Sequence, residues 1–442
     1  MSEPSRPITY ARVTAIAVPV VLSNATVPLQ GAIDMAIIGN TGDTTLLAAV
    51  TLGATMIALV FSSFNFLQIG VSGLTAQALG AGKPTRVMNT LLRALMIAAL
   101  ISLVLILVRA PLGRGILLAF EASDAAEAAA LSYFVIRVLG APFELGVYPF
   151  FGWFAGQERT RRLFEMQLII SVANIGLTFL FVLVFEWGIE GVAFGTVCGN
   201  AAGLAYALWY ARRRRREILP PTWRPERRRL FDGAELATLM RLNRDIFIRT
   251  VLLVVSMTWV ARLGSLQSDA VLAANGILLE FLFITSHGLD GFAIAAETLV
   301  GQAKGARSKR ALRRAAVISS VAAFGVAALF SVILWVFAHD IIRIFTDLEP
   351  VREVAFEYAI WAALIPLVGV GAYQLDGIFV GASDGPAMRN SMIVAAGVFL
   401  PVGWWATVTF GNHAMWASLW LFLIVRALAL LALYPRLEAR VS

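Results

Sequence analysis

Long runs of apolar residues recur along the whole chain, separated by short polar stretches. A helix needs about 20 residues to cross a bilayer, and about twelve runs reach that length. They cover residues 13–38, 47–70, 87–110, 128–155, 163–187, 190–211, 238–262, 271–302, 313–338, 356–380, 388–410 and 413–434. This pattern predicts an all-α membrane protein with about twelve transmembrane helices.

The composition supports this prediction. Of the 442 residues, 59% are hydrophobic and 14% are charged, whereas soluble domains are roughly half apolar and about a quarter charged. The single cysteine, Cys198, excludes an internal disulfide. The N-terminal residues MSEPSRPITYAR lack the apolar core and cleavage site of a signal peptide, so we expect the first helix to be retained.

The basic residues are concentrated in alternate loops. The richest loop is 212-RRRRREILPPTWRPERRR-229, whereas loops such as 186-EWGIE-190 contain no basic residue. Lys and Arg mark the cytoplasmic side, which predicts a multi-pass protein of the plasma (bacterial inner) membrane with both termini cytoplasmic. Basic runs beside a membrane serve topology and contact with anionic lipid, so we expect membrane lipid, and no nucleic acid, as a partner despite the net charge of +8.

The two halves of the chain resemble each other at one ungapped offset of 225 residues. Residues that recur include Gln77, Gly80 and Ala81 with Gln302, Gly305 and Ala306, and Gly152, Phe154 and Gly156 with Gly377, Phe379 and Gly381. The predicted domains are an N-terminal six-helix lobe (1–211), a cytoplasmic basic linker (212–236) and a C-terminal six-helix lobe (237–442). Six helices per half predict a parallel repeat, which is typical of secondary transporters.

Four stretches resemble the DinF (damage-inducible F) branch of the multidrug and toxic compound extrusion (MATE) transporters. They are 33-IDMAIIGNTGDTTLLAAV-50, 242-LNRDIFIRT-250, 289-LDGFAIAAETLVGQAKGA-306 and 375-LDGIFVGASDGPAMRNSM-392. The resemblance implies two pseudo-symmetric six-helix bundles that export organic compounds in exchange for protons or sodium. We expect a monomer that transports cationic or amphipathic small molecules and has no cofactor besides the coupling ion.

Asp34 is an acid close to the end of the first apolar run. A charge at the bilayer centre costs about 2.5–3.5 kcal/mol even on insertion scales, so such acids usually face the protein interior and serve function. Burial in general raises the pKa of a carboxylate toward neutral pH. The resemblance implies that Asp34 is the coupling acid; the alternative is a residue at the outer membrane interface.

Four other polar residues match positions that surround the coupling acid or a bound cation in relatives: Tyr133, Asn174, Thr178 and Thr196. Asn174 and Thr178 are one turn apart and share a helix face. Thr178 stands where some relatives have a second acid. Losing a carboxylate favours proton over sodium coupling, because a hard cation prefers several oxygen ligands and negative charge. The alternative for these polar side chains is ordinary interhelical hydrogen bonding.

The C-terminal half contains a second set of intramembrane charges. Arg249, Asp290, Asp376 and Arg426 fall at similar depth, and Glu280 lies further out on the same helix as Asp290. Because an unpaired buried charge is strongly destabilising, we expect mutual pairing, with a structural or gating role; direct substrate or proton binding is the alternative.

A substrate cavity could be lined by Glu144, Tyr148, Trp153, Phe283 and Tyr373, because a carboxylate and aromatic rings bind organic cations. With three histidines and one cysteine in the chain, we expect no metal site. The absence of nucleophile, metalloprotease and phosphate-loop motifs argues against an enzyme. A proton-coupled antiporter is the leading function; sodium-coupled efflux and a flippase for lipid or lipid-linked precursors are the alternatives.

Overall fold

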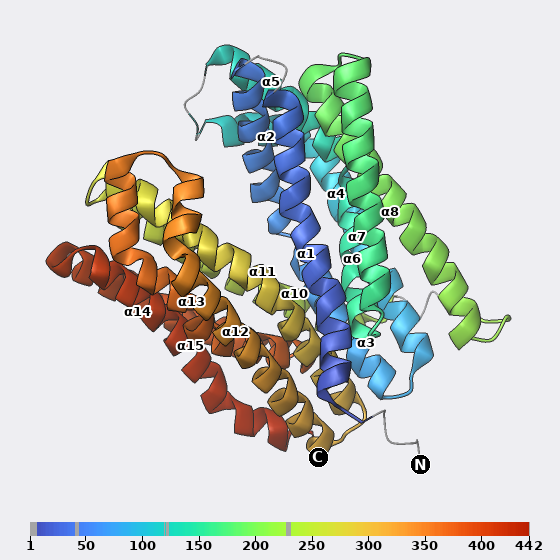
Figure 1. The fold of residues 1–442 in the computed structure, drawn as a ribbon. Coiled ribbons are helices and arrows are strands. Elements are labelled where there is room, and N and C mark those ends of the chain that lie inside the picture. The colour runs from blue at the N-terminus through green and yellow to red at the C-terminus, as the bar shows by residue number, and fades with distance from the viewer. Residues whose placement is uncertain (1–6, 40–43, 119, 121–122, 227–230, 442) are drawn as a thin grey trace. The chain divides into compact units, whose positions relative to one another are not determined.

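The computed structural model describes residues 7–39, 44–118, 120, 123–226 and 231–441, and these residues form helices joined by short turns (Figure 1). No β-strand occurs among them. The helices are α1 (Tyr10–Gly39), α2 (Thr44–Ser62), α3 (Phe66–Gly80), α4 (Pro84–Leu117), α5 (Asp124–Leu139), α6 (Ala141–Gly156), α7 (Thr160–Phe179), α8 (Gly188–Ile218), α10 (Gly233–Ser265), α11 (Asp269–Gly305), α12 (Lys309–Phe345), α13 (Glu349–Gly381), α14 (Gly385–Phe410) and α15 (Asn412–Ala439). A π-helical turn (Leu180–Val184) extends α7.

Within the described residues, 11 helical segments are long and apolar enough to cross a membrane, or up to 12 if one bent pair counts as a span. The predicted all-α, multi-pass fold is therefore confirmed. The span predicted over 128–155 is bent: α5 and α6 meet at an angle of 55°. Gly140 separates them, and Pro142 begins α6 in its first turn, where the missing proline N–H breaks no helical hydrogen bond.

The described chain divides into two compact units. Leu22–Leu239 form the N-terminal unit, and the residues up to Val21 together with those from Met240 onward form the C-terminal unit. Helices α1 and α10 each contribute residues to both. These limits differ from those of the predicted lobes, whose boundaries stay a prediction. Residues 40–43 of the predicted outer loop and 227–230 of the predicted linker lie outside the described residues.

The predicted repeat is visible in the packing inside each unit. A Cβ atom added to Gly152 of α6 would lie 2.1 Å from the carbonyl oxygen of Gln68 in α3. In the other unit, one added to Gly377 of α13 would lie 2.3 Å from the carbonyl oxygen of Ala293 in α11. Both residues of the second contact stand 225 positions after those of the first. Glycine is thus required at both places because the helix backbones touch.

Turns repeat at the same offset. Gly82 and Arg307 both have positive φ (65° and 53°), as do Glu158 and Ser383 (58° and 51°). Each pair ends a helix in the left-handed conformation, which satisfies the last helical carbonyls. Non-glycine residues are uncommon there, so the shared backbone conformation reflects a shared fold and not merely the choice of glycine.

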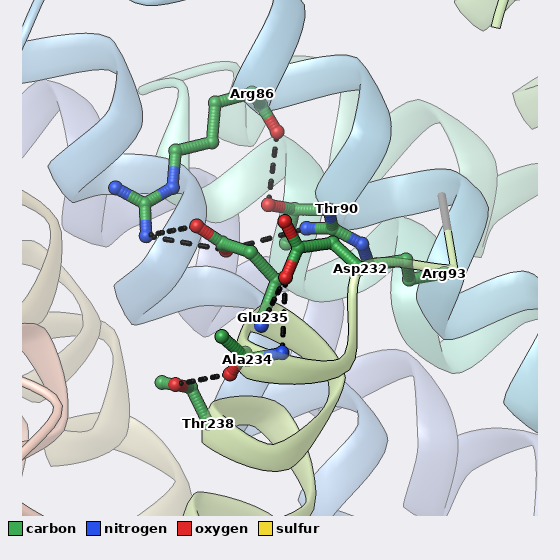
Figure 2. Close-up of polar contacts among 7 residues, drawn as sticks. All are labelled: Arg86, Thr90, Arg93, Asp232, Ala234, Glu235 and Thr238. Atoms are coloured by element: carbon green, nitrogen blue, oxygen red, sulfur yellow. Dashed lines mark hydrogen bonds and ion pairs between the residues drawn. The ribbon is translucent and has the colours of Figure 1, made fainter. Parts of the chain in front are cut away.

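Helix α10 begins with a cluster of polar contacts inside the N-terminal unit (Figure 2). The Asp232 carboxylate accepts hydrogen bonds from the backbone N–H groups of Ala234 (2.9 Å) and Glu235 (3.2 Å) and so caps the helix. The Glu235 carboxylate pairs with Arg86 Nη2 at 3.1 Å and with Arg93 Nη1 at 3.3 Å, both on α4. The first turn of α10 is therefore fixed to α4.

Candidate functional site

Asp34 lies on α1 against α7. Its carboxylate is beside the side chains of Asn174 and Thr178 and within electrostatic range of Arg137. Asn174 and Thr178 are fully buried. Asn174 Nδ2 donates to Thr196 Oγ1 at 3.0 Å, and Thr196 Oγ1 donates to the Val192 carbonyl at 3.1 Å. The structure thus brings together four of the five residues expected around the coupling site.

Three oxygens in this cluster are buried without a hydrogen-bond partner among the described residues: Asp34 Oδ1, Asn174 Oδ1 and Thr178 Oγ1. A buried acceptor without a donor is costly, by about 1–3 kcal/mol. Asn174 uses its amide to donate to Thr196, so its oxygen can only accept, whereas the Thr178 hydroxyl can donate as well as accept. A proton on Asp34 would supply a donor for Asn174 Oδ1.

A row of glycines on α8 allows this arrangement. Gly191, Gly195, Gly199 and Gly203 recur every four residues and face α7. A Cβ atom at Gly195 would lie 2.3 Å from Thr178 Oγ1, and one at Gly199 would lie 2.8 Å from the Ile170 carbonyl oxygen. Small residues at this spacing let membrane helices approach closely, which places Thr196 against Asn174.

Arg137 links the acid cluster to a second carboxylate. Its guanidinium forms an ion pair with Glu144 (2.7 Å) and donates to the Tyr133 hydroxyl (2.9 Å). Asn200 Nδ2 also reaches Glu144, at 3.4 Å. Tyr133 therefore contacts the site through Arg137, and Glu144 is a partner of an arginine in this structure. Tyr148 lies within electrostatic range of Glu144 and Arg137.

In the C-terminal unit, Asp376 is the centre of the charge network. Its Oδ2 pairs with Nη2 of both Arg249 and Arg426. Asp290 lies in electrostatic range of the same two arginines. Tyr373 belongs here as well, because it lies within electrostatic range of Arg426 and Asp290. Its hydroxyl accepts a hydrogen bond of 3.0 Å from Ser286 Oγ. Four charges from α10, α11, α13 and α15 are therefore grouped within one unit, as expected.

The remaining predicted residues lie elsewhere. Glu280 is exposed and forms no ion pair with the other four charges in the described part of the chain. Trp153 is fully buried: its side chain packs on Phe150 and Phe154 and donates to the Val87 carbonyl at 3.1 Å. Its place in a substrate cavity stays a prediction. Phe283 is 42% exposed on α11.

Arg137 and the glycines of α8 belong to the candidate site but not to the residues predicted from the sequence. Arg137 is a basic residue inside a run predicted to be a membrane helix, and that position alone was a usable signal. The four-residue glycine period on α8 was a second one. The described residues contain no group of three His, Cys, Asp or Glu side chains that could hold a metal ion.

The family model described as MatE matches residues 19–180 and 246–405. The chain is similar to DNA damage-inducible protein F of Escherichia coli (strain K12), with 35% identity over 435 residues, 95% of this chain and 91% of that protein. It is 30% identical over 312 residues to the probable multidrug resistance protein NorM of Rhizobium meliloti (strain 1021), covering 65% of this chain and 64% of that protein.

Solved structures with the same fold include a MATE protein in a bent conformation, with a TM-score of 0.87 at 16% identity, covering 97% of this chain and 95% of that one. A MOP superfamily transporter from Pyrococcus furiosus has a TM-score of 0.85 at 16% identity, covering 98% and 96%. At this identity the likeness concerns the fold alone.

Proposed function

The chain belongs to the MatE family of membrane transporters, and from this premise we propose that it exports small organic compounds in exchange for protons. Relatives named as multidrug resistance proteins support the substrate class. The observation that carries the proposal is Asp34, a membrane-segment carboxylate beside Asn174, whose buried Oδ1 has no donor among the described residues.

Proton binding solves the hydrogen-bond problem of this cluster. An ionised Asp34 can only accept, and the Thr178 hydroxyl can donate to it, whereas a protonated Asp34 can also donate to Asn174 Oδ1. The two protonation states therefore favour different arrangements of α1 and α7. A ligand that binds only one arrangement becomes linked to the proton, which is the thermodynamic requirement of an antiporter.

The pairing of Glu144 with Arg137 argues for the proton over sodium. A sodium ion needs several oxygen ligands and gains from negative charge. Only one of the two nearby carboxylates remains for a cation, because Glu144 is paired with Arg137 at 2.7 Å. The partnerless oxygens of Asn174 and Thr178 are the observation that favours sodium as the second candidate.

Transport in everted membrane vesicles tests the proposal. A fluorescent organic cation is added outside vesicles containing the protein, and its uptake into the lumen is followed under a pH gradient alone and then under a sodium gradient alone. We expect movement under the pH gradient, since each pH unit supplies about 1.4 kcal/mol, and none under the sodium gradient. Movement under sodium only would replace the proton with sodium; movement under neither would reject antiport of such cations.

A further inference from the structure

The start of α12 carries a basic hollow that the transport site does not use. Four basic side chains surround it: Lys309, Arg310, Arg313 and Arg314. Its volume is about 610 Å³, within the ~300–1,000 Å³ range of small-molecule sites. The acid Glu438, at the end of α15, lies on the opposite wall. All of these residues belong to the C-terminal unit.

Most of the positive charge around the hollow has no acidic partner among the described residues. Arg313 Nε pairs with Glu438 at 3.2 Å. The side chains of Lys309, Arg310 and Arg314 are exposed and have no ion pair or hydrogen bond within the described residues. Three free cations around one hollow are the donors that an anion needs, and arginines bind phosphate oxygens through paired N–H groups.

An apolar face continues directly from this charge. Arg310, Arg314, Val317, Val321 and Phe324 follow one another at steps of four and three residues, which places them on one face of α12. Val317, Val321 and Phe324 are 54%, 51% and 45% exposed. Basic residues at the end of a membrane helix, followed by an exposed apolar stripe, match the headgroup and the acyl chain of a phospholipid in turn.

From this juxtaposition we propose that the hollow binds the phosphate headgroup of an anionic phospholipid, whose acyl chain lies along Val317, Val321 and Phe324. The basic loops are predicted to be cytoplasmic, and anionic lipids attract such clusters on that side of a membrane. The apolar wall formed by Val317 and Ile318 distinguishes a lipid from a free anion, because inorganic phosphate gains nothing from apolar contact.

Lipid titration of the purified full-length protein tests the proposal. Native mass spectrometry in detergent at about 150 mM salt, where charges beyond about 8 Å are screened, counts bound dioleoylphosphatidylglycerol and dioleoylphosphatidylcholine. We expect the double variant Arg310→Gln/Arg314→Gln to bind phosphatidylglycerol about tenfold more weakly, since each basic residue beside an anionic surface contributes several-fold. Phosphatidylcholine binding should not change.

The matched control is Arg212→Gln/Arg216→Gln. These two arginines are exposed, stand four residues apart at the end of α8, and line no such hollow. We expect less than about a twofold change, because they can act only through diffuse charge. An equal loss in both double variants would mean general surface attraction and overturn the site.

A variant that should strengthen lipid binding distinguishes loss of the site from loss of the fold. Glu438→Gln removes the one acid of the hollow and frees Arg313, so phosphatidylglycerol should bind severalfold more tightly. Sodium phosphate and glycerol 3-phosphate distinguish a soluble ligand. Weak competition by both at millimolar concentration fits a lipid site; displacement of the lipid at micromolar concentration, or weaker binding by Glu438→Gln, would overturn the assignment.

Discussion

Asp34 is the residue on which exchange depends in the proposed mechanism. We expect Asp34→Asn to abolish proton-driven efflux while the protein still inserts and folds. Asparagine keeps the shape and imitates the protonated acid, since its amide supplies a donor for Asn174 Oδ1. Thr178→Ala should reduce efflux only partly, because a hydroxyl can tune the acid but not replace it. Dye efflux from vesicles measures both.

Asp269→Asn is the control, because it removes a carboxylate from the exposed first turn of α11. Substrate addition should release protons from the wild type and from this control, but not from Asp34→Asn. If Asp34→Asn transports normally and keeps its response to the pH gradient, Asp34 is an interfacial residue and coupling resides in the C-terminal charges.

Asp376 pairs with two arginines at once, so removing it should destabilise the protein more than removing either arginine. Breaking a buried pair costs about 3–5 kcal/mol because a charge is left uncompensated. We expect Arg426→Ala to lower the unfolding temperature in detergent, and Asp376→Ala to lower it further. The double variant Asp376→Ala/Arg426→Ala should recover part of the sum, with a coupling of about 1–3 kcal/mol.

The same cycle with Asp290→Ala serves as the comparison. Asp290 lies in range of the arginines without an ion pair to them among the described residues, so its coupling to Arg426 should be smaller. Additive effects of Asp376 and Arg426 would show that their pairing contributes nothing to stability.

Single residues show why part of the site could be predicted and part could not. Spacing along an apolar run gives the depth of a charge, so Arg249, Asp376 and Arg426 were rightly placed together. Depth does not say which way a side chain turns. The sequence could not tell that both arginines meet Asp376, that Trp153 is enclosed in the core, or that Arg137 rather than solvent is the partner of Glu144.

Among the helices, the packing of α7 against α8 depends on the glycines of α8. Gly195→Ala should disturb the Asp34 cluster, because the new methyl group would lie 2.3 Å from Thr178 Oγ1. Overpacking of this kind costs about 1–3 kcal/mol, and it should lower both the unfolding temperature and proton-driven efflux. Gly176→Ala on α7 is the control: no atom lies within 4 Å of its added Cβ, so neither property should fall.

The first turn of α10 gives a second prediction for an element. Glu235→Gln removes the charge that holds Arg86 and Arg93 (Figure 2). Arg93 is only 5% exposed, so it would be left without its carboxylate. Because Glu235 itself is about one third exposed, the loss is screened to about 1 kcal/mol. Thermal unfolding should show this loss of stability for Glu235→Gln. The control Glu353→Gln, at an exposed position of α13, should leave the unfolding temperature unchanged.

The helices themselves were easy to predict, and their breaks were not. Hydropathy joins α5 and α6 into one run because both are apolar, and it contains no information on the angle between them. The signal was local: 140-GAP-142 contains a glycine followed by a proline at the start of a helix, which is a common helix boundary. The split between α2 and α3 carries no such signal, since the residues between them, Ser63, Phe64 and Asn65, do not exclude a helix.

For the whole molecule, the orientation in the membrane is open to a direct test. In a Cys198→Ser background, Thr222→Cys in the basic linker should resist a membrane-impermeant thiol reagent added to intact cells. Leu266→Cys, 44% exposed between α10 and α11, should react. This position also spares Ser268, whose hydroxyl caps α11. Reaction of Thr222→Cys and protection of Leu266→Cys would reverse the orientation predicted from the arginines.

The turns and close contacts that recur 225 residues apart indicate how the chain evolved. Left-handed turns at Glu158 and Ser383 are conformations that side chains rarely adopt, so two independent origins at matching places would be an unusual coincidence. A duplicated gene explains them. The intramembrane acids do not recur in this way: the counterparts of Asp34 and Asp376 at that offset are Trp259 and Phe151. After the duplication, the ancestral skeleton was kept in both copies, while each copy acquired its own chemistry.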